Sequence, residues 1–157
     1  MIIRQAQKND LPTISQVKNP RTDKLRRELE KIARERINHV KTRESALLVA
    51  EDNGQIVGHV HLRLKDPQHS CSWIEDLYVK EAERHRGIGT ALIEAGESFV
   101  RANGHSNIGI SVNPTLNAHV KKLYEKLGYR KTGRPAYLDG VYDGTEDWVV
   151  DMEKPLK

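Results

Sequence analysis

A short stretch of the chain combines two glycines with two arginines at the start of an expected helix. It consists of Arg84, His85, Arg86, Gly87, Ile88, Gly89 and Thr90. The first turn of a helix presents unpaired backbone N–H groups and the positive end of the helix dipole, which together attract anions. Gly87 and Gly89 lack a Cβ atom, so a phosphate can approach the backbone closely, and the arginines add positive charge. The stretch predicts a cradle for a pyrophosphate group.

Two other phosphate-binding loops do not fit this stretch. A Walker loop needs Gly-Lys followed by Ser or Thr, which does not occur here. A dinucleotide-binding loop needs a third glycine where Leu92 stands and an acidic residue about 20 positions further on, where Gly109 and Ile110 stand. Taken alone, the stretch would also fit a helix that merely starts with a tight turn.

A second stretch follows at a characteristic distance. Asn117 precedes the run Leu123-Tyr124-Glu125-Lys126-Leu127-Gly128-Tyr129, and the strand-like run Leu77-Tyr78-Val79 precedes the glycine-containing stretch. Together these segments resemble the acetyl-CoA signature of the GNAT superfamily of N-acetyltransferases. The specific motifs cover residues 73–129, and the expected order of elements is similar to that of the family over nearly the whole chain.

The resemblance implies how acetyl-CoA is held. In this family the strand ending at Val79 and the strand 108–112 splay apart, and pantetheine pairs with the free backbone edge of Leu77, Tyr78 and Val79. A backbone N–H near Val79 polarises the thioester carbonyl. Asn117 matches a polar contact to the cofactor. Val120 stands where the family commonly has alanine, which would narrow the channel beside the cofactor.

Tyr124 matches the usual general acid of the family. Attack by an amine expels a thiolate, and a phenol of pKa about 10 can protonate a thiol of pKa about 8.5 if it is held close. The alternative is that Tyr124 only packs its ring in the core beside Leu123.

The acceptor amine must lose a proton before it attacks, so the site needs a base, direct or through water. The two-residue period of a strand predicts Trp73, Glu75, Leu77 and Val79 on one face and Asp76 on the other, unless a β-bulge changes the register. We take Glu75 as the base. The run from Glu75 to Val79 is similar to the corresponding strand of polyamine and aminoglycoside acetyltransferases, whose acids serve cationic substrates. Alternatively, Glu75 pairs with an arginine on the sheet surface.

Four acids and three aromatic residues gather between Tyr137 and Trp148. They could form a wall for a cationic or aromatic acceptor. They could equally form a solvated hairpin turn built on Asp-Gly pairs.

Three further features suggest no chemistry. His59 and His61 share one strand face without a third ligand at metal-binding spacing, so we expect a solvated face and no metal site. Cys71 is the one cysteine and has no neighbour that would activate it. Basic residues outnumber acidic ones between Lys18 and Glu44, which would suit a nucleic-acid-binding helix but is more typical of a solvated amphipathic helix.

Length and composition limit the number of domains and the location that we expect for the protein. The chain has 157 residues, 37% of them hydrophobic and 31% charged, which fits one folded domain over residues 1–157. We expect no membrane segment and, from the single cysteine, a cytoplasmic protein. Apolar periodicity predicts helices over 22–40, 88–102 and about 120–127, and strands over 2–6, 46–50, 56–64, 71–79, 108–112, 129–131 and 148–152, with a polar loop between the last two. The expected fold is mixed α/β, with a mostly antiparallel central sheet, a splayed parallel strand pair and flanking helices.

The sequence thus predicts an N-acetyltransferase that moves acetyl from acetyl-CoA to a primary amine by direct attack in a ternary complex. The acceptor would be a cationic small molecule or a protein amine, and a homodimer is common in the family. The alternative is a catalytically weak module that senses acyl-CoA or binds nucleic acid through the helix 22–40, although nucleic acid is not the partner that we expect.

Overall fold

The computed structural model describes residues 1–40 and 45–156. The elements run in the order β1 (Ile2–Gln5), α1 (Leu11–Val17), α2 (Asp23–Val40), β2 (Ser45–Asp52), β3 (Gln55–Arg63), β4 (Ser72–Val79), α3 (Ile88–Ala102), β5 (Asn107–Val112), α4 (Ala118–Lys126), β6 (Arg130–Lys131), β7 (Tyr137–Tyr142) and β8 (Thr145–Pro155). Short 3-10 turns at Lys8–Asp10 (η1) and Glu81–Glu83 (η2) precede α1 and α3.

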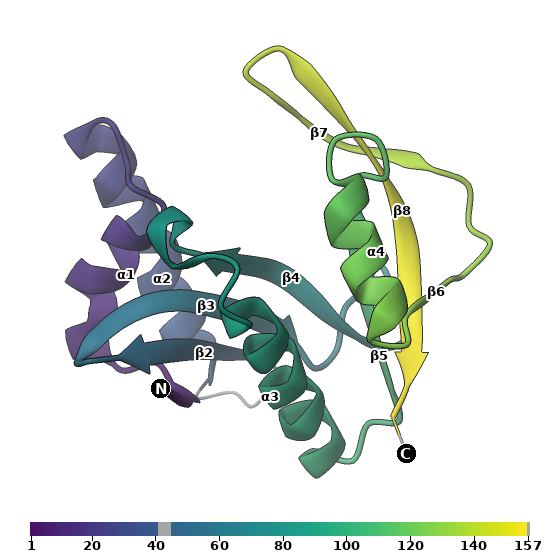
Figure 1. The fold of residues 1–157 in the computed structure, drawn as a ribbon, viewed down its shortest axis with the longest axis horizontal. Coiled ribbons are helices and arrows are strands. Elements are labelled where there is room, and N and C mark those ends of the chain that lie inside the picture. Colours follow the sequence, from purple (N-terminus) through teal and green to yellow (C-terminus); the bar gives the residue numbers. More distant parts are fainter. Residues whose placement is uncertain (41–44, 157) are drawn as a thin grey trace.

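The strands form one eight-stranded sheet in the order β1-β2-β3-β4-β5-β8-β6, and β7 pairs with β8. The pair β4–β5 is parallel, and the other neighbours are antiparallel. Because the parallel pair needs a crossover, α3 connects its two strands (Figure 1). The expected mixed α/β fold with a mostly antiparallel sheet and flanking helices is confirmed.

Apolar side chains pack on both faces of the sheet. On one face, Leu92, Ile93 and Val100 of α3 contact a cluster that includes Val60 and Ile110. On the other face, α1 and α2 cover a second cluster, which includes Ile14, Ala33, Ile37, Leu47 and Val49. None of the helices in the described ranges combines the length and apolar character that a bilayer crossing requires.

Two tight turns close the β2–β3 and β7–β8 hairpins. Asn53 and Gly54 both have positive φ, 50° and 76°, and join β2 to β3 as their sequence predicts. Asp143 and Gly144 repeat this geometry with 51° and 76° and join β7 to β8. The expectation of a polar loop before the last strand is therefore wrong, because most of that segment is a strand.

Candidate functional site

Strands β4 and β5 meet only at their beginnings. Their pairing is confined to Ser72 with Ile108, Trp73 with Gly109 and Ile74 with Ile110. Beyond this point β5 stays paired with β8 over its whole length, whereas β4 keeps a partner only in β3. The edge of β4 from Glu75 to Val79 is therefore open toward β5, as the expected splay requires.

The residue opposite Trp73 makes this close start of the pair feasible. A Cβ atom added to Gly109 would lie 2.1 Å from the Trp73 ring, so only glycine leaves room for the indole. From this point a cleft of about 1140 Å³ opens between the diverging strands. Its walls come from β4, the start of α3, the end of β5, α4 and the β7–β8 hairpin.

A β-bulge changes the faces of β4. His61 lies opposite Asp76 and Leu62 opposite Ile74, so Glu75 has no partner on β3. As a result, Leu77 and Val79 pack against the α3 cluster together with Ile74, while Tyr78 packs against the cluster beneath α1 and α2. The expected alternation, with Glu75 and Asp76 on opposite faces, is therefore wrong.

Both carboxylates instead contact side chains on the α1–α2 face. Glu75 accepts a hydrogen bond of 3.0 Å from Nε of Arg63, and Nδ1 of His61 lies 2.5 Å from the same oxygen, although its ring N–H does not point at it. The His61 ring and then Arg63 lower the pKa of Glu75 to about 2, against the opposing effect of burial. Glu75 also lines the cleft, and it makes the alternative pairing with an arginine; its role as the base stays a prediction.

The neighbouring Asp76 holds α1 and α2 to the sheet. It pairs with Lys18 at 3.1 Å and with Arg36 at 2.9 Å, and His59 lies 3.9 Å away. His59 and His61 are only 4% and 3% exposed, so the expected solvated face is wrong: the two helices cover it. No cluster of three metal ligands occurs among residues 1–40 and 45–156.

The stretch 84–90 forms the start of α3. Gly87 is its N-cap, in the left-handed region with φ 77°, and His85 also has a positive φ of 65°. The backbone N–H groups of residues 85–90 donate no hydrogen bond to another residue in the described ranges. With the exception of Arg86, the residues of this stretch line the cleft, which makes the helix start available to an anion.

The two arginines of this stretch have different surroundings. Arg84 donates from Nε to the carbonyl of Val79 at 3.0 Å, and its guanidinium lies over the Tyr78 ring. Arg86 pairs with Glu83 and, at 3.0 Å, with Asp52. Arg84 therefore lies at the open edge of β4. Arg86 does not line the cleft and connects the loop to Asp52 of β2.

Tyr124 packs in the core and also lines the cleft. Its ring is 4% exposed and packs against Tyr129 with 5.8 Å between ring centroids, yet the residue lines the cleft. Burial raises the pKa of its phenol, and within the described ranges the hydroxyl has no hydrogen-bond partner. Asn117, the N-cap of α4, and Val120 line the same wall.

A partly buried ion pair holds Tyr129, the residue on which the Tyr124 ring packs. The hydroxyl of Tyr129 donates to Glu97 at 3.0 Å, and Nζ of Lys154 pairs with the same carboxylate at 3.0 Å. These residues come from α3, the connection between α4 and β6, and β8, so no local motif predicts that they meet.

The other end of the cleft is built partly from residues that the sequence analysis did not select. Asp151 of β8 is buried and accepts hydrogen bonds from Ser111 of β5 and Tyr137 of β7. His69 stacks on Trp73 with 3.5 Å between centroids and lies between Asp66 and Asp151. A polar residue at a buried position of an apolar strand, such as Asp151 in β8, could have indicated this part of the cleft. Its partners lie on other strands, and the sequence does not show that these strands meet.

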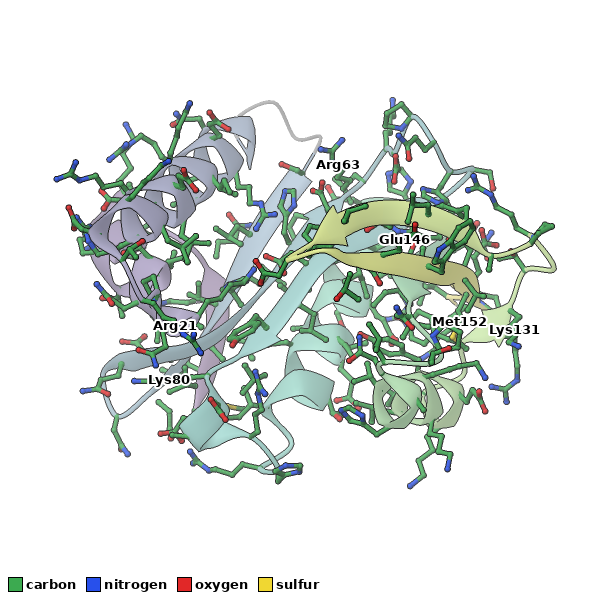
Figure 2. The ribbon with its side chains drawn as sticks, turned by 90° about the horizontal axis from the view of Figure 1, so that it is seen from above. Arg21, Arg63, Lys80, Lys131, Glu146 and Met152 are labelled. Carbon is green, nitrogen blue, oxygen red and sulfur yellow. The ribbon has the colours of Figure 1, made fainter. Side chains whose placement is uncertain are left out.

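The acidic and aromatic segment 137–148 divides between two faces of the β7–β8 hairpin. One set lines the cleft and comprises Tyr137, Asp139, Tyr142 and Asp147. Leu138 and Trp148 lie opposite each other outside this lining and are exposed. Figure 2 labels Glu146 on this hairpin and Arg63 at the end of β3; of the two, Arg63 lines the cleft. Part of the segment thus lines the cleft, and Asp143 and Gly144 form the hairpin turn of the other interpretation.

Comparison with known proteins agrees with this geometry. Residues 9–129 match the model of the acetyltransferase (GNAT) family. The chain is 30% identical over 118 residues to N-acetyltransferase 8 of Rattus norvegicus, covering 73% of this chain and 50% of that protein. It is 30% identical over 120 residues to an N-alpha-acetyltransferase of Sulfurisphaera tokodaii, covering 66% of this chain and 69% of that protein. The chain thus spans about half the length of the rat relative.

A solved structure extends the likeness to the whole fold. The PaiA N-acetyltransferase of Thermoplasma acidophilum, in complex with coenzyme A, superposes with a TM-score of 0.74 at 18% identity, covering 98% of each chain. The match to the family model covers most of this chain and includes the loop at the start of α3 and Tyr124. The chain therefore belongs to the GNAT family of acetyltransferases.

Proposed function

We propose that the protein transfers the acetyl group of acetyl-CoA to a primary amine by direct attack. One observation carries the proposal: the open edge of β4, from Glu75 to Val79, leads directly to the unpaired N–H groups at the start of α3. A strand edge suits the amide-containing pantetheine arm, and a helix start suits a pyrophosphate. Acetyl-CoA supplies the acetyl group as a thioester.

The residues that fit coenzyme A lie along one path. Leu77, Tyr78 and Val79 would bind the pantetheine arm through their backbone, and Asn117 would contact it from α4. The pyrophosphate would lie on the loop that consists of Arg84, His85, Gly87, Ile88, Gly89 and Thr90. Arg86, which pairs with Asp52 and Glu83, would act on it only by fixing the loop and adding positive charge.

Tyr124 would donate its hydroxyl proton to the departing sulfur. Its raised pKa keeps the phenol protonated at neutral pH, which a proton donor requires. Because no residue in the described ranges receives its hydrogen bond, the hydroxyl can turn toward a group in the cleft.

Glu75 would accept the proton that the attacking amine loses. Its low pKa keeps it ionised, so it attracts an ammonium group strongly. The same low pKa means that it must pass the proton on at once, which a water in the open cleft can receive.

The acceptor would be a cationic small molecule or a protein amine. Glu75, Asp139 and Asp147 all line the acceptor end of the cleft, and they favour a positive charge. The Sulfurisphaera relative is named an N-alpha-acetyltransferase, which keeps protein α-amines in this class. A nucleic-acid partner is disfavoured, since the arginines of α2 pair with acids of the chain, as Arg26 does with Asp23 and Glu30.

A screen for release of free CoA from acetyl-CoA, over polyamines, amino sugars and peptides with free N-termini, tests the proposal. We expect at least one amine to release CoA, and Tyr124→Phe to lower kcat by about a hundredfold or more while the dissociation constant of CoA stays the same. Binding of CoA without transfer to any amine would contradict an enzymatic role and favour an acyl-CoA sensor.

A further inference from the structure

Asp151 is a buried carboxylate that stands just behind the acceptor end of the cleft. It is 4% exposed on β8, directly opposite Ser111 of β5. Its Oδ1 accepts hydrogen bonds from Tyr137 Oη at 2.7 Å and from Ser111 Oγ at 3.0 Å. Its Oδ2 lies 3.2 Å from Nη1 of Arg134 and 3.2 Å from Nε2 of His69.

The partners of Asp151 reach the cleft, although Asp151 itself does not line it. Ser111, Tyr137 and His69 all belong to the cleft wall. Asp151 therefore acts on a bound molecule only through these side chains. Its charge is held in place by Arg134, which also lies over the Tyr137 ring at 4.0 Å.

The hydrogen bonds to Asp151 decide what the two hydroxyls can offer. Each hydroxyl has one proton, and a carboxylate can only accept. Ser111 Oγ and Tyr137 Oη also lie 3.0 Å apart, so each proton is donated either to Oδ1 or to the other hydroxyl. Toward the cleft they then present lone pairs alone. An ammonium group is the complementary ligand, because it has three N–H donors and no acceptor.

The charges around these hydroxyls favour the same ligand. Asp139 and Asp147 face this end of the cleft, and Asp66 lies 2.8 Å from His69. Burial, followed by the charges of Asp147 and Asp151, raises the pKa of Asp139, which indicates negative charge that nearby cations do not fully balance.

We propose that Asp151 is a positioning residue, which holds the Ser111 and Tyr137 hydroxyls as acceptors for an ammonium group of the acceptor substrate. The inference rests on the proposed function, since it concerns the same cleft, and it narrows the acceptor to amines that arrive charged. Where the acceptor has two amines, the ammonium held here would be the one that does not react.

Asp151→Asn tests this role because the side chain keeps its shape. Arg134 contacts Oδ2, so the amide that keeps this contact turns its NH₂ toward the hydroxyls. The hydroxyls then accept from that NH₂, and at least one of their two protons turns into the cleft, where it repels an ammonium group. With spermidine as the probe and CoA-loaded protein, we expect Asp151→Asn to raise the dissociation constant of spermidine about tenfold or more. The dissociation constant of CoA should not change.

A variant that lacks both hydroxyls separates positioning from a structural role. Ser111→Ala/Tyr137→Phe should weaken spermidine binding as much as Asp151→Asn does, and adding Asp151→Asn to it should produce no further loss. Full additivity, or equal weakening of CoA and spermidine, would overturn the proposal. If Asp151→Asn does not fold, the variant without hydroxyls decides alone, and unchanged spermidine binding overturns the inference.

The free-CoA assay distinguishes this inference from the proposed function. If the wild type transfers acetyl and Asp151→Asn binds spermidine as tightly as the wild type does, the inference is wrong and the proposed function stands. If Asp151→Asn weakens spermidine binding but the wild type transfers acetyl to no amine, the proposed function is wrong and the inference stands.

Discussion

At the scale of single residues, the surroundings of Glu75 determine how its role can be tested. His61 and Arg63 lower its pKa to about 2, so its carboxylate is ionised throughout the range from pH 5 to pH 9. Its own titration then lies below that range. An inflection in the activity profile between pH 5 and pH 9 must belong to another group.

Glu75→Gln should therefore lower kcat/KM by a similar factor, about a hundredfold, at every pH between 5 and 9. The pH–rate profile with the best amine of the screen measures this, and Glu81→Gln, an exposed change outside the cleft, should leave the profile as it is. An unchanged kcat/KM of Glu75→Gln across this range would remove Glu75 as the base.

The sequence predicted some residues of the cleft and missed others for a physical reason. Arg84, Gly87, Asn117 and Tyr124 could be selected because each belongs to a contiguous motif. Ser111, Asp151 and His69 could not, since a loop and two distant strands bring them together. The face of Glu75 was also unpredictable, because a bulge depends on the partner strand and not on the sequence of β4 alone.

At the scale of elements, the contact between β4 and β5 depends on one glycine. Gly109→Ala would place a Cβ atom 2.1 Å from the buried Trp73 ring, so either the indole or the strand must move. We expect a loss of about 3 kcal/mol in the free energy of unfolding, measured with urea. Gly89→Ala is the matched control: its Cβ would meet Val79 at an ordinary 3.7 Å, so unfolding should change little. Equal stability of both variants would contradict this account of the pair.

Strand β3 carries the buried histidines that join the sheet to α1 and α2. Burial lowers the pKa of His59 to about 4, against an ordinary value of about 6.5. Between these values the unfolded chain binds more protons than the folded chain, so stability falls as the pH decreases through this window. His61, whose pKa is also lowered by burial, contributes in the same direction.

His59→Gln should flatten the decline in stability between pH 6.5 and pH 4. One proton accounts for at most about 1.4 kcal/mol per pH unit, so the slope of unfolding free energy against pH should decrease by up to that amount. Urea unfolding at several pH values measures the slope. The exposed His119→Gln is the control, and a slope that is the same in both variants would show that His59 does not cause the acid sensitivity.

The elements themselves were predictable where a strong local signal exists. The Asn53–Gly54 turn and the apolar stripe of α3 both appear in the structure as expected. Strand β7 was missed because Asp139 and Gly140 interrupt its apolar pattern, since one side of the hairpin faces the cleft. Such a strand resembles a loop in sequence.

At the scale of the whole molecule, the cleft lies between two parts of the sheet that share three residue pairs. A molecule that contacts both walls should oppose their separation. Coenzyme A should therefore raise the thermal midpoint of unfolding, with a stabilisation of about 2.7 kcal/mol at a hundred times its dissociation constant. Scanning calorimetry measures the shift of the thermal midpoint with CoA, and a scan with spermidine in place of CoA gives the shift with which it is compared. No shift with saturating CoA would contradict binding to the folded cleft.

The strand order also has a consequence for the time course of folding. Strand β2 pairs with β3 and β3 with β4, each across a short connection, whereas β5 pairs on one edge with β8, which begins more than thirty residues later. During synthesis the first part of the sheet can thus form while β5 has no partner on that side. We expect amides of β2 and β3 to become protected from hydrogen exchange before those of β5. The cleft is then the last part of the fold to form, so a nascent chain would bind acetyl-CoA only after β8 has been made.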